Sequence, residues 1–111
     1  MALENEEYSF IVRDATLQRF EYTVELFWKT LQAWLFTIEG IECASPKKCI
    51  RTAASLQLLD TPETEEALQM IDDRNLISHS YLEEIAMQIY GRCHDYALLM
   101  GKVLDRISSN N

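Results

Sequence analysis

Four residues that can bind a phosphate or move a proton lie within eight positions in the second half of the chain: Arg74, Asn75, His79 and Tyr81. An arginine presents a planar fork of donors that fits a phosphate and keeps its charge. A histidine can take up or release a proton near neutral pH. Without a metal ion these two groups can cleave RNA at its own 2′-hydroxyl, because the histidine moves the proton and the arginine stabilises charge on phosphorus. Asn75 would orient either group or the substrate.

The spacing of these residues also permits a purely structural interpretation. On a regular helix Arg74 and His79 point about 140° apart, whereas Asn75 and His79 are one turn apart and share a side. A kink near Ser78, or a second copy of the chain across a two-fold axis, would bring an arginine and a histidine together. Alternatively, Arg74 pairs with a preceding aspartate or with a neighbouring helix, and Asn75 and His79 only terminate the helix.

The composition indicates a substantial core and an acidic surface. The chain has 111 residues, is 48% hydrophobic and has a formal net charge of −8. We therefore expect one domain spanning residues 1–111, with residues 107–111 as a flexible tail. The negative charge argues against a protein that coats nucleic acid, because non-specific affinity comes mainly from lysine and arginine. It leaves room for one local phosphate site and could steer a basic partner.

The elements that must position the four residues are expected to be helices, since three glycines and two prolines leave few breakpoints. Apolar residues in steps of three and four predict a long first helix that stops at Gly40. More apolar residues lie off this seam, so the helix needs a second partner surface, either within its own bundle or between two copies of the chain. The seam is Leu17, Phe20, Val24, Phe27, Leu31, Trp34 and Ile38, and the residues off it are Tyr22, Leu26, Trp28, Leu35 and Phe36.

Three further helices are expected. Ser45 and Thr61 should cap the second and third helices, because each precedes a proline suited to the first helical position. The fourth helix should start near Leu82, where a new apolar seam begins. The linkers near residues 40–45, 59–61 and 79–81 are short, which makes sequential helices antiparallel neighbours. The sequence predicts an all-α, antiparallel, up-and-down bundle of four helices, or five if residues 8–13 form a separate turn.

The cysteines and the N-terminus bear on the compartment. Cys43, Cys49 and Cys93 form an odd set without a CxxC pair, which argues against a disulfide framework or a zinc site and favours a reducing cytosol. The segment MALENEEYSF is acidic and lacks the apolar run of a signal peptide. No stretch approaches the roughly 18 apolar residues of a membrane span. We therefore expect a cytoplasmic protein that is not in a membrane.

Other candidate sites are weaker. Asp72 and Asp73 are adjacent and diverge on a helix, so no metal site is expected there, and no cofactor is expected. Glu25 and Lys29 are one turn apart, as in an ordinary helical ion pair. Neither a glycine-rich phosphate loop nor a paired-aspartate motif for nucleotidyl transfer appears. Any transferase activity must therefore belong to a partner.

Three segments resemble the nucleotidyltransferase substrate-binding family of HEPN domains. They are RFEYTVELFWKTLQAWL (19–35), SPKKCIRTA (45–53) and MIDDRNLISHSY (70–81). The pattern Arg-x4-His-x-Tyr, at Arg74, His79 and Tyr81, is weak alone but specific when joined to the segment FEYTVELFWK. The resemblance implies a small helical protein that is usually encoded beside a minimal nucleotidyltransferase.

The resemblance carries further expectations. Members are antiparallel four- or five-helix bundles that form homodimers, in which the arginine and histidine motifs of two subunits meet in one cleft. In toxin–antitoxin pairs such a protein is a metal-independent ribonuclease, silenced when its partner transfers AMP to the motif tyrosine. Carried over, Arg74 and His79 become catalytic, Asn75 supportive and Tyr81 the modified residue. Ala67 stands where the family often has an aromatic residue, which would loosen packing or open a groove beside the motif.

Three functions remain to be distinguished. The first is the ribonuclease toxin. The second is a non-catalytic subunit that docks a nucleotidyltransferase and uses Arg74 and His79 to hold a nucleotide phosphate. The third is a purely structural dimer, in which Arg74 has no part in binding. Cleavage of RNA separates the first function from the others.

Overall fold

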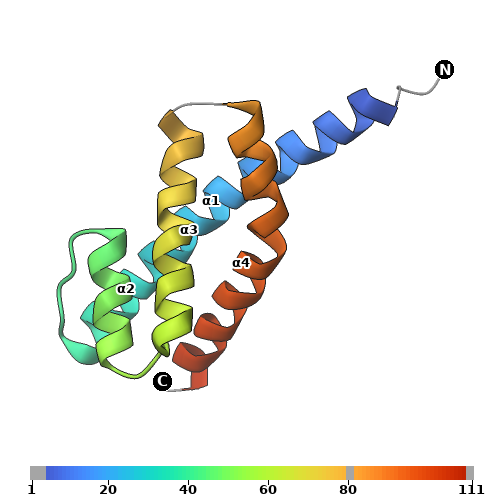
Figure 1. The fold of residues 1–111 in the computed structure, drawn as a ribbon. Coiled ribbons are helices and arrows are strands. Elements are labelled where there is room, and N and C mark those ends of the chain that lie inside the picture. The colour runs from blue at the N-terminus through green and yellow to red at the C-terminus, as the bar shows by residue number, and fades with distance from the viewer. Residues whose placement is uncertain (1–4, 80–81, 110–111) are drawn as a thin grey trace.

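The computed structural model describes residues 5–79 and 82–109 and contains four helices. They are α1 (Asn5–Glu39), α2 (Pro46–Ser55), α3 (Thr61–His79) and α4 (Glu83–Ser109). Three long helices and the shorter α2 pack into a bundle (Figure 1). No strand occurs among the described residues, so the prediction of an all-α bundle is confirmed. Residues 107–109, assigned above to a tail, belong to α4, and Ile107 is buried.

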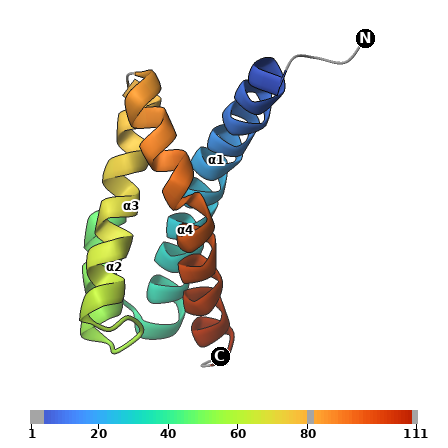
Figure 2. The same ribbon diagram turned by 45° about the vertical axis from the view of Figure 1, so that its right-hand side comes forward.

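α1 is the longest element and extends past the rest of the bundle at its N-terminus (Figure 2). Residues 8–13 continue α1 without interruption, so they form no separate fifth helix. The predicted seam is buried from Leu17 to Trp34, whereas Ile38, close to the helix end, is 48% exposed. Gly40 follows with φ +68°, a conformation that glycine adopts without steric cost.

The caps of α2 and α3 differ in how well they were predicted. Ser45 caps α2 as expected, because its side chain accepts a hydrogen bond from the backbone N–H of Lys48. Asp60, not Thr61, caps α3. The Asp60 carboxylate accepts from the Glu63 N–H at 2.8 Å, and the Glu63 carboxylate accepts from the Asp60 N–H at 3.0 Å. This reciprocal capping box satisfies two backbone donors at once, which a lone threonine cap would not do.

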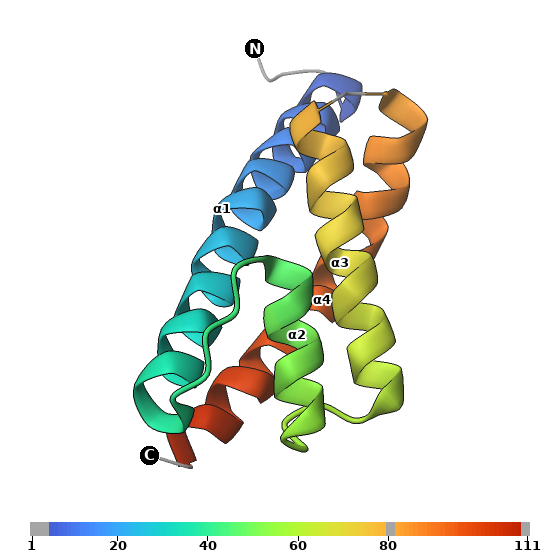
Figure 3. The ribbon, with the colours of Figure 1, turned by 90° about the vertical axis from the view of Figure 1, so that its left-hand side faces the viewer.

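The link between α1 and α2 runs back along α1 before α2 begins (Figure 3). Gln32 donates from its side-chain amide to the Cys43 carbonyl at 2.7 Å, and Ser45 lies in one depression with Glu25 and Trp28. Six extended residues can span about 20 Å, enough to return over roughly three helical turns. α2 therefore runs in the same direction as α1, while α3 and α4 each reverse direction.

A disulfide joins Cys43 in this link to Cys49 in α2, so the argument from the odd cysteine count against disulfides was wrong. The returning link brings their Cα atoms to 5.3 Å, a separation that a disulfide can bridge. An odd count of cysteines excludes only complete pairing, and here Cys93 remains the free thiol. The absence of paired cysteines can therefore no longer be used as an argument for a reducing compartment.

The core is one cluster with side chains from all four helices. Ala67 is fully buried within it, so it opens no groove to solvent. Aromatic rings of α1 and α4 stack where Phe20 meets Tyr96, with centroids 5.6 Å apart. In the part of the chain that the structure describes, no helix is long and apolar enough to cross a membrane.

Candidate functional site

The Arg74 side chain projects from α3 towards α1, and both terminal nitrogens of its guanidinium donate hydrogen bonds. Its Nη2 donates to Glu25 Oε1 at 2.5 Å, and its Nη1 donates to Asn75 Oδ1 at 3.2 Å. The arginine side chain remains 27% exposed and that of Glu25 31% exposed. The pairing with a neighbouring helix, one of the alternatives left open by the sequence, is therefore present. It fixes the cation without removing it from solvent.

Glu25 receives two further donors from α1 itself. Trp28 donates from its indole nitrogen at 3.1 Å, and Lys29 forms the expected ion pair at 3.1 Å. The hydrogen bonds from Trp28 and Lys29, together with the positive charge of Arg74, lower the pKa of Glu25 below its usual value. The carboxylate therefore stays ionised and keeps Arg74 in place near neutral pH.

A surface depression of about 420 Å³ contains Arg74 and Asn75. Its other walls come from α1 and from the start of α2, where Lys47 adds a second cation. Both cations have carboxylate partners, because Lys47 contacts Asp72 at 2.6 Å while Arg74 contacts Glu25. The complete lining, called here the motif groove, is Glu25, Trp28, Ser45, Pro46, Lys47, Ile71, Arg74 and Asn75.

His79 is the last residue of α3 and is exposed. α3 continues as a helix through Ser78 to His79, and Ser78 donates to Glu21 of α1 at 2.7 Å. On such a helix Arg74 and His79 point about 140° apart. The structure thus joins Arg74 to Asn75 but does not bring His79 to them within one copy of the chain. Tyr81, the predicted modification site, lies outside the described residues.

The two aspartates before the motif have separate partners. Asp72 is exposed and pairs with Lys47, whereas Asp73 is buried and points to α4. Arg92 grips Asp73 with two hydrogen bonds of 2.9 and 3.2 Å, and the Tyr96 hydroxyl donates to it at 2.5 Å. No cluster of metal-ligating side chains occurs among the residues described. The expected divergence of the two carboxylates is confirmed.

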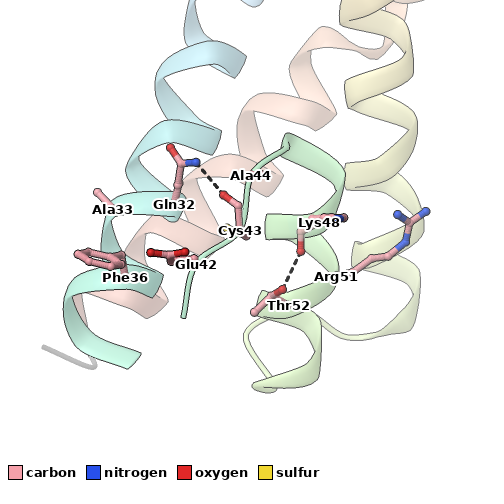
Figure 4. A pocket seen from close by; sticks show the side chains of 9 residues that line it. All are labelled: Gln32, Ala33, Phe36, Glu42, Cys43, Ala44, Lys48, Arg51 and Thr52. Carbon is pink, nitrogen blue, oxygen red and sulfur yellow. Dashed lines mark hydrogen bonds between the residues drawn. The ribbon is translucent and has the colours of Figure 1, made fainter. Parts of the chain in front are cut away.

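A larger depression of about 810 Å³ lies at the other end of the bundle from His79, between α1, α2 and the link that joins them (Figure 4). Within it Gln32 bonds the Cys43 carbonyl and Thr52 bonds the Lys48 carbonyl. It contains neither the arginine nor the histidine of the motif. Its lining is Gln32, Ala33, Phe36, Glu42, Cys43, Ala44, Lys48, Arg51 and Thr52.

A family model described as nucleotidyltransferase substrate binding protein like matches residues 1–109. The chain belongs to this family. The description associates it with a nucleotidyltransferase. A crystal structure of a protein from Thermus thermophilus is 52% identical and superposes with a TM-score of 0.84, covering 87% of this chain and 82% of that one. No curated protein matches.

Three residues of this nucleotidyltransferase substrate binding protein-like chain were missed as a group by sequence reasoning. Asp73, Arg92 and Tyr96 form a cluster, called here the brace, directly beside the motif. In it Asp73 and Tyr96 are buried, and the Arg92 side chain is 37% exposed. Burial, followed by the bond to Asp73, raises the pKa of Tyr96, and the bond to Asp73 raises the pKa of Arg92. A signal was present, because Asp73 lies three residues after Met70 and so falls near the buried side of α3.

Proposed function

We propose that the chain is the HEPN-type subunit of a two-gene toxin–antitoxin-like module, a metal-independent endoribonuclease whose partner is a separate minimal nucleotidyltransferase. The setting of Arg74 carries the proposal. Glu25 and Asn75 fix its guanidinium at the wall of the motif groove, yet 27% of the side chain stays exposed. A fixed and accessible cation suits the negative charge that develops on a phosphate in the transition state.

The reaction needs no metal ion or cofactor. The ribose 2′-oxygen attacks the adjacent phosphorus, the bond from phosphorus to the 5′-oxygen breaks, and a 2′,3′-cyclic phosphate and a 5′-hydroxyl result. A neutral imidazole takes the 2′-hydroxyl proton, and a protonated imidazole gives one to the 5′-oxygen. We assign these imidazoles to His79 of two copies in a homodimer, because Arg74 and His79 of one copy diverge. Arg74 binds the phosphate, and Asn75 holds Arg74.

The nucleotidyltransferase silences the enzyme by transferring AMP to Tyr81. The phenol oxygen bonds to the α-phosphorus of ATP, pyrophosphate leaves, and the phenolic proton goes to solvent. Tyr81 follows His79 by two residues, so a bulky, charged nucleotide there would obstruct RNA. We place this activity in the cytoplasm, where RNA and ATP are both present.

Growth and RNA cleavage test this function. Expression of the chain alone should slow growth, and Arg74→Ala or His79→Ala should relieve the effect. The purified protein should cut RNA in the presence of EDTA, with each substitution lowering the rate at least about 100-fold. Arg51→Ala and His94→Ala are matched controls, because both side chains are exposed and lie outside the motif groove. RNA left intact by the purified wild-type dimer would refute the ribonuclease function.

A second candidate is a non-catalytic subunit that presents a nucleotide to the transferase. The pairing of Arg74 with Glu25 in the groove, and of Lys47 with Asp72 beside it, favours it, since a phosphate could exchange with these carboxylates without any chemistry. This function requires nucleotide binding that Arg74→Ala weakens, with RNA uncut. The RNA assay therefore decides between the two candidates.

A further inference from the structure

The Cys43–Cys49 disulfide lies at the larger depression, the one of about 810 Å³ between α1, α2 and their link. Its volume falls within the range of about 300–1,000 Å³ that is usual for small-molecule sites. Cys43 is among the residues that line it, whereas Cys49 is not. Cys43 is 6% exposed and Cys49 is fully buried. Since thiol–disulfide exchange requires access to a sulfur, Cys43 is the half of the disulfide that a molecule in the depression can attack.

Cys49 occupies a position that suits a departing thiolate. It is the fourth residue of α2, and its backbone N–H donates to the carbonyl of the capping residue Ser45 at 3.0 Å. Because helical side chains lean towards the N-terminus of their helix, the Cys49 sulfur lies over the first turn. The partial positive charge of a helix N-terminus stabilises an anion there. Attack at Cys43 therefore releases the sulfur whose negative charge is the better stabilised.

The α2 wall of the depression carries two cations, Lys48 and Arg51 (Figure 4). Both residues are exposed, and among residues 5–79 and 82–109 neither forms an ion pair with a carboxylate. Figure 4 shows Glu42, the acidic member of the lining, on the other wall beside Phe36. The lining is thus net positive in a chain whose net charge is −8. Unpaired cations in such a site favour a ligand that carries its own carboxylates.

We propose that this depression is a site of thiol–disulfide exchange for a small thiol that carries carboxylates, with Cys43 as the sulfur attacked. The incoming thiol gives its proton to solvent, and its thiolate bonds to Cys43 as the Cys43–Cys49 bond breaks. Cys49 leaves with the electron pair and takes a proton from solvent. The product is a mixed disulfide at Cys43. A second thiol then displaces the small molecule as its disulfide, so two thiols are oxidised and both cysteines are reduced.

The remaining thiol of the chain does not compete with the small molecule. Cys93 lies on α4, and burial raises its pKa to about 11. Because the thiolate is the attacking species, Cys93 stays inert near neutral pH. A disulfide in the cytoplasm, where the proposed function places the chain, is usually transient and redox-sensing. A depression that admits small thiols to Cys43 agrees with that use.

Exchange would also act on the motif groove, and this step rests on the proposed function. The link between α1 and α2 contributes to both depressions, since Cys43 lines the larger one and residues 45–47 line the motif groove. The disulfide, the bond from Gln32 to the Cys43 carbonyl and the helix cap hold this link. Opening the disulfide removes the covalent restraint. The reduced protein should therefore hold Lys47 less firmly in the groove and cleave RNA more slowly.

Exchange in the folded protein tests the site. Wild type is treated with glutathione at neutral pH, quenched in acid and mapped by mass spectrometry. We expect a glutathione adduct on Cys43, a free thiol at Cys49 and an exchange rate within about tenfold of that in urea. A disulfide that opened only on global unfolding would exchange at least about 1,000-fold more slowly in native buffer than in urea. That result, or an adduct on Cys49, would overturn the proposal.

The charge of the thiol tests recognition. Relative to the same two thiols in urea, glutathione should react with the native protein at least about threefold faster than cysteamine, a cationic thiol. The double variant Lys48→Gln/Arg51→Gln should lose this preference. Arg19→Gln/Lys102→Gln is the matched control, because both residues are exposed and lie outside the depression. Equal rates for the two thiols in wild type, or a preference that survives in the double variant, would contradict a site for anionic thiols.

The RNA assay separates failure of the exchange site from failure of the proposed function. Reduced wild type should cleave RNA at least about threefold more slowly than oxidised wild type, because a displaced groove wall misplaces the substrate. Cys43→Ser should cleave at the reduced rate with or without glutathione. Exchange at Cys43 in a protein that leaves RNA intact in both states keeps the exchange site and removes the ribonuclease function. Equal cleavage in both states keeps the ribonuclease and removes the control of the groove by the disulfide.

Discussion

Two adjacent residues of α3, Asp73 and Arg74, each form an arginine–carboxylate pair with a different neighbouring helix. Asp73 points to α4, where Arg92 and the Tyr96 hydroxyl bind it, and its side chain is 4% exposed whereas that of Arg92 is 37% exposed. Arg74 points to α1, where it binds Glu25, and the two side chains are 27% and 31% exposed. Each carboxylate accepts three hydrogen bonds from side chains. The two regions therefore differ in the burial of the carboxylate and not in the number of hydrogen bonds that it accepts.

Burial decides what each pair can do. A buried carboxylate cannot lose its partners without leaving a charge in an apolar environment, so the brace holds α3 against α4. An exposed pair contributes little to stability because water competes for both partners. Arg74 is therefore free to exchange its carboxylate for a phosphate, whereas Arg92 is not. The brace beside it supplies a rigid α3 from which Arg74 projects.

The brace should give the largest effect on stability. Asp73→Ala leaves the buried Tyr96 hydroxyl without its acceptor, while the Arg92 guanidinium, 37% exposed, can be solvated, and we expect a loss of about 2–4 kcal/mol in the free energy of unfolding. Tyr96→Phe removes one donor and should cost about 1–2 kcal/mol. Urea unfolding followed by circular dichroism measures both. An Asp73→Ala loss below that of Tyr96→Phe would contradict the role given to burial.

A third pair, Glu63 with Arg106, is intermediate in exposure, at 15% and 39%. Hydrogen bonds from Arg106, followed by the capping bond from Asp60, lower the pKa of Glu63 to about 2. A lowered pKa contributes stability that is complete above the ordinary value near 4.5 and is lost as the pH falls towards 2. Glu63→Gln keeps the capping box but loses the charge.

We expect Glu63→Gln to be less stable than wild type at pH 7 by about 2 kcal/mol, and this difference should shrink as the pH falls from about 4.5 to about 2. Urea unfolding at pH 7, 4 and 2.5 measures the difference. Arg106 also donates to the Leu58 carbonyl at 2.8 Å, a bond that the substitution leaves intact. A difference between the two proteins that does not change with pH would show that the ion pair is not its source.

Local sequence patterns predicted the helices. Most of the features that the sequence did not predict are contacts between residues far apart in the chain. The seam on α1 and the cap at Ser45 depend on neighbours within one turn, so they could be read directly from the sequence. Asp73 meets Tyr96 across 23 residues and Arg74 meets Glu25 across 49. Such pairings depend on how the helices pack, which periodicity does not encode.

The same limit applies to the loop and the site. The sequence predicted a short link at residues 40–45, but only its return path along α1 brings Cys43 to Cys49. Arg74 and Asn75 were expected to share a site and do share the motif groove. His79 lies at the end of α3, and within one copy of the chain its side chain points away from Arg74, as the helical spacing predicted.

The exposed pair should give the smallest effect on stability and the sharpest contrast with the brace. Arg74→Ala should lower the free energy of unfolding by less than about 1 kcal/mol, because Glu25 remains solvated and keeps Trp28 and Lys29 as donors. The substitution nevertheless removes the cation proposed to bind phosphate. Urea unfolding and the RNA assay on the same preparation test both statements. A loss as large as that of Asp73→Ala would mean that Arg74 is a structural residue and that the motif groove, like the brace, holds helices together.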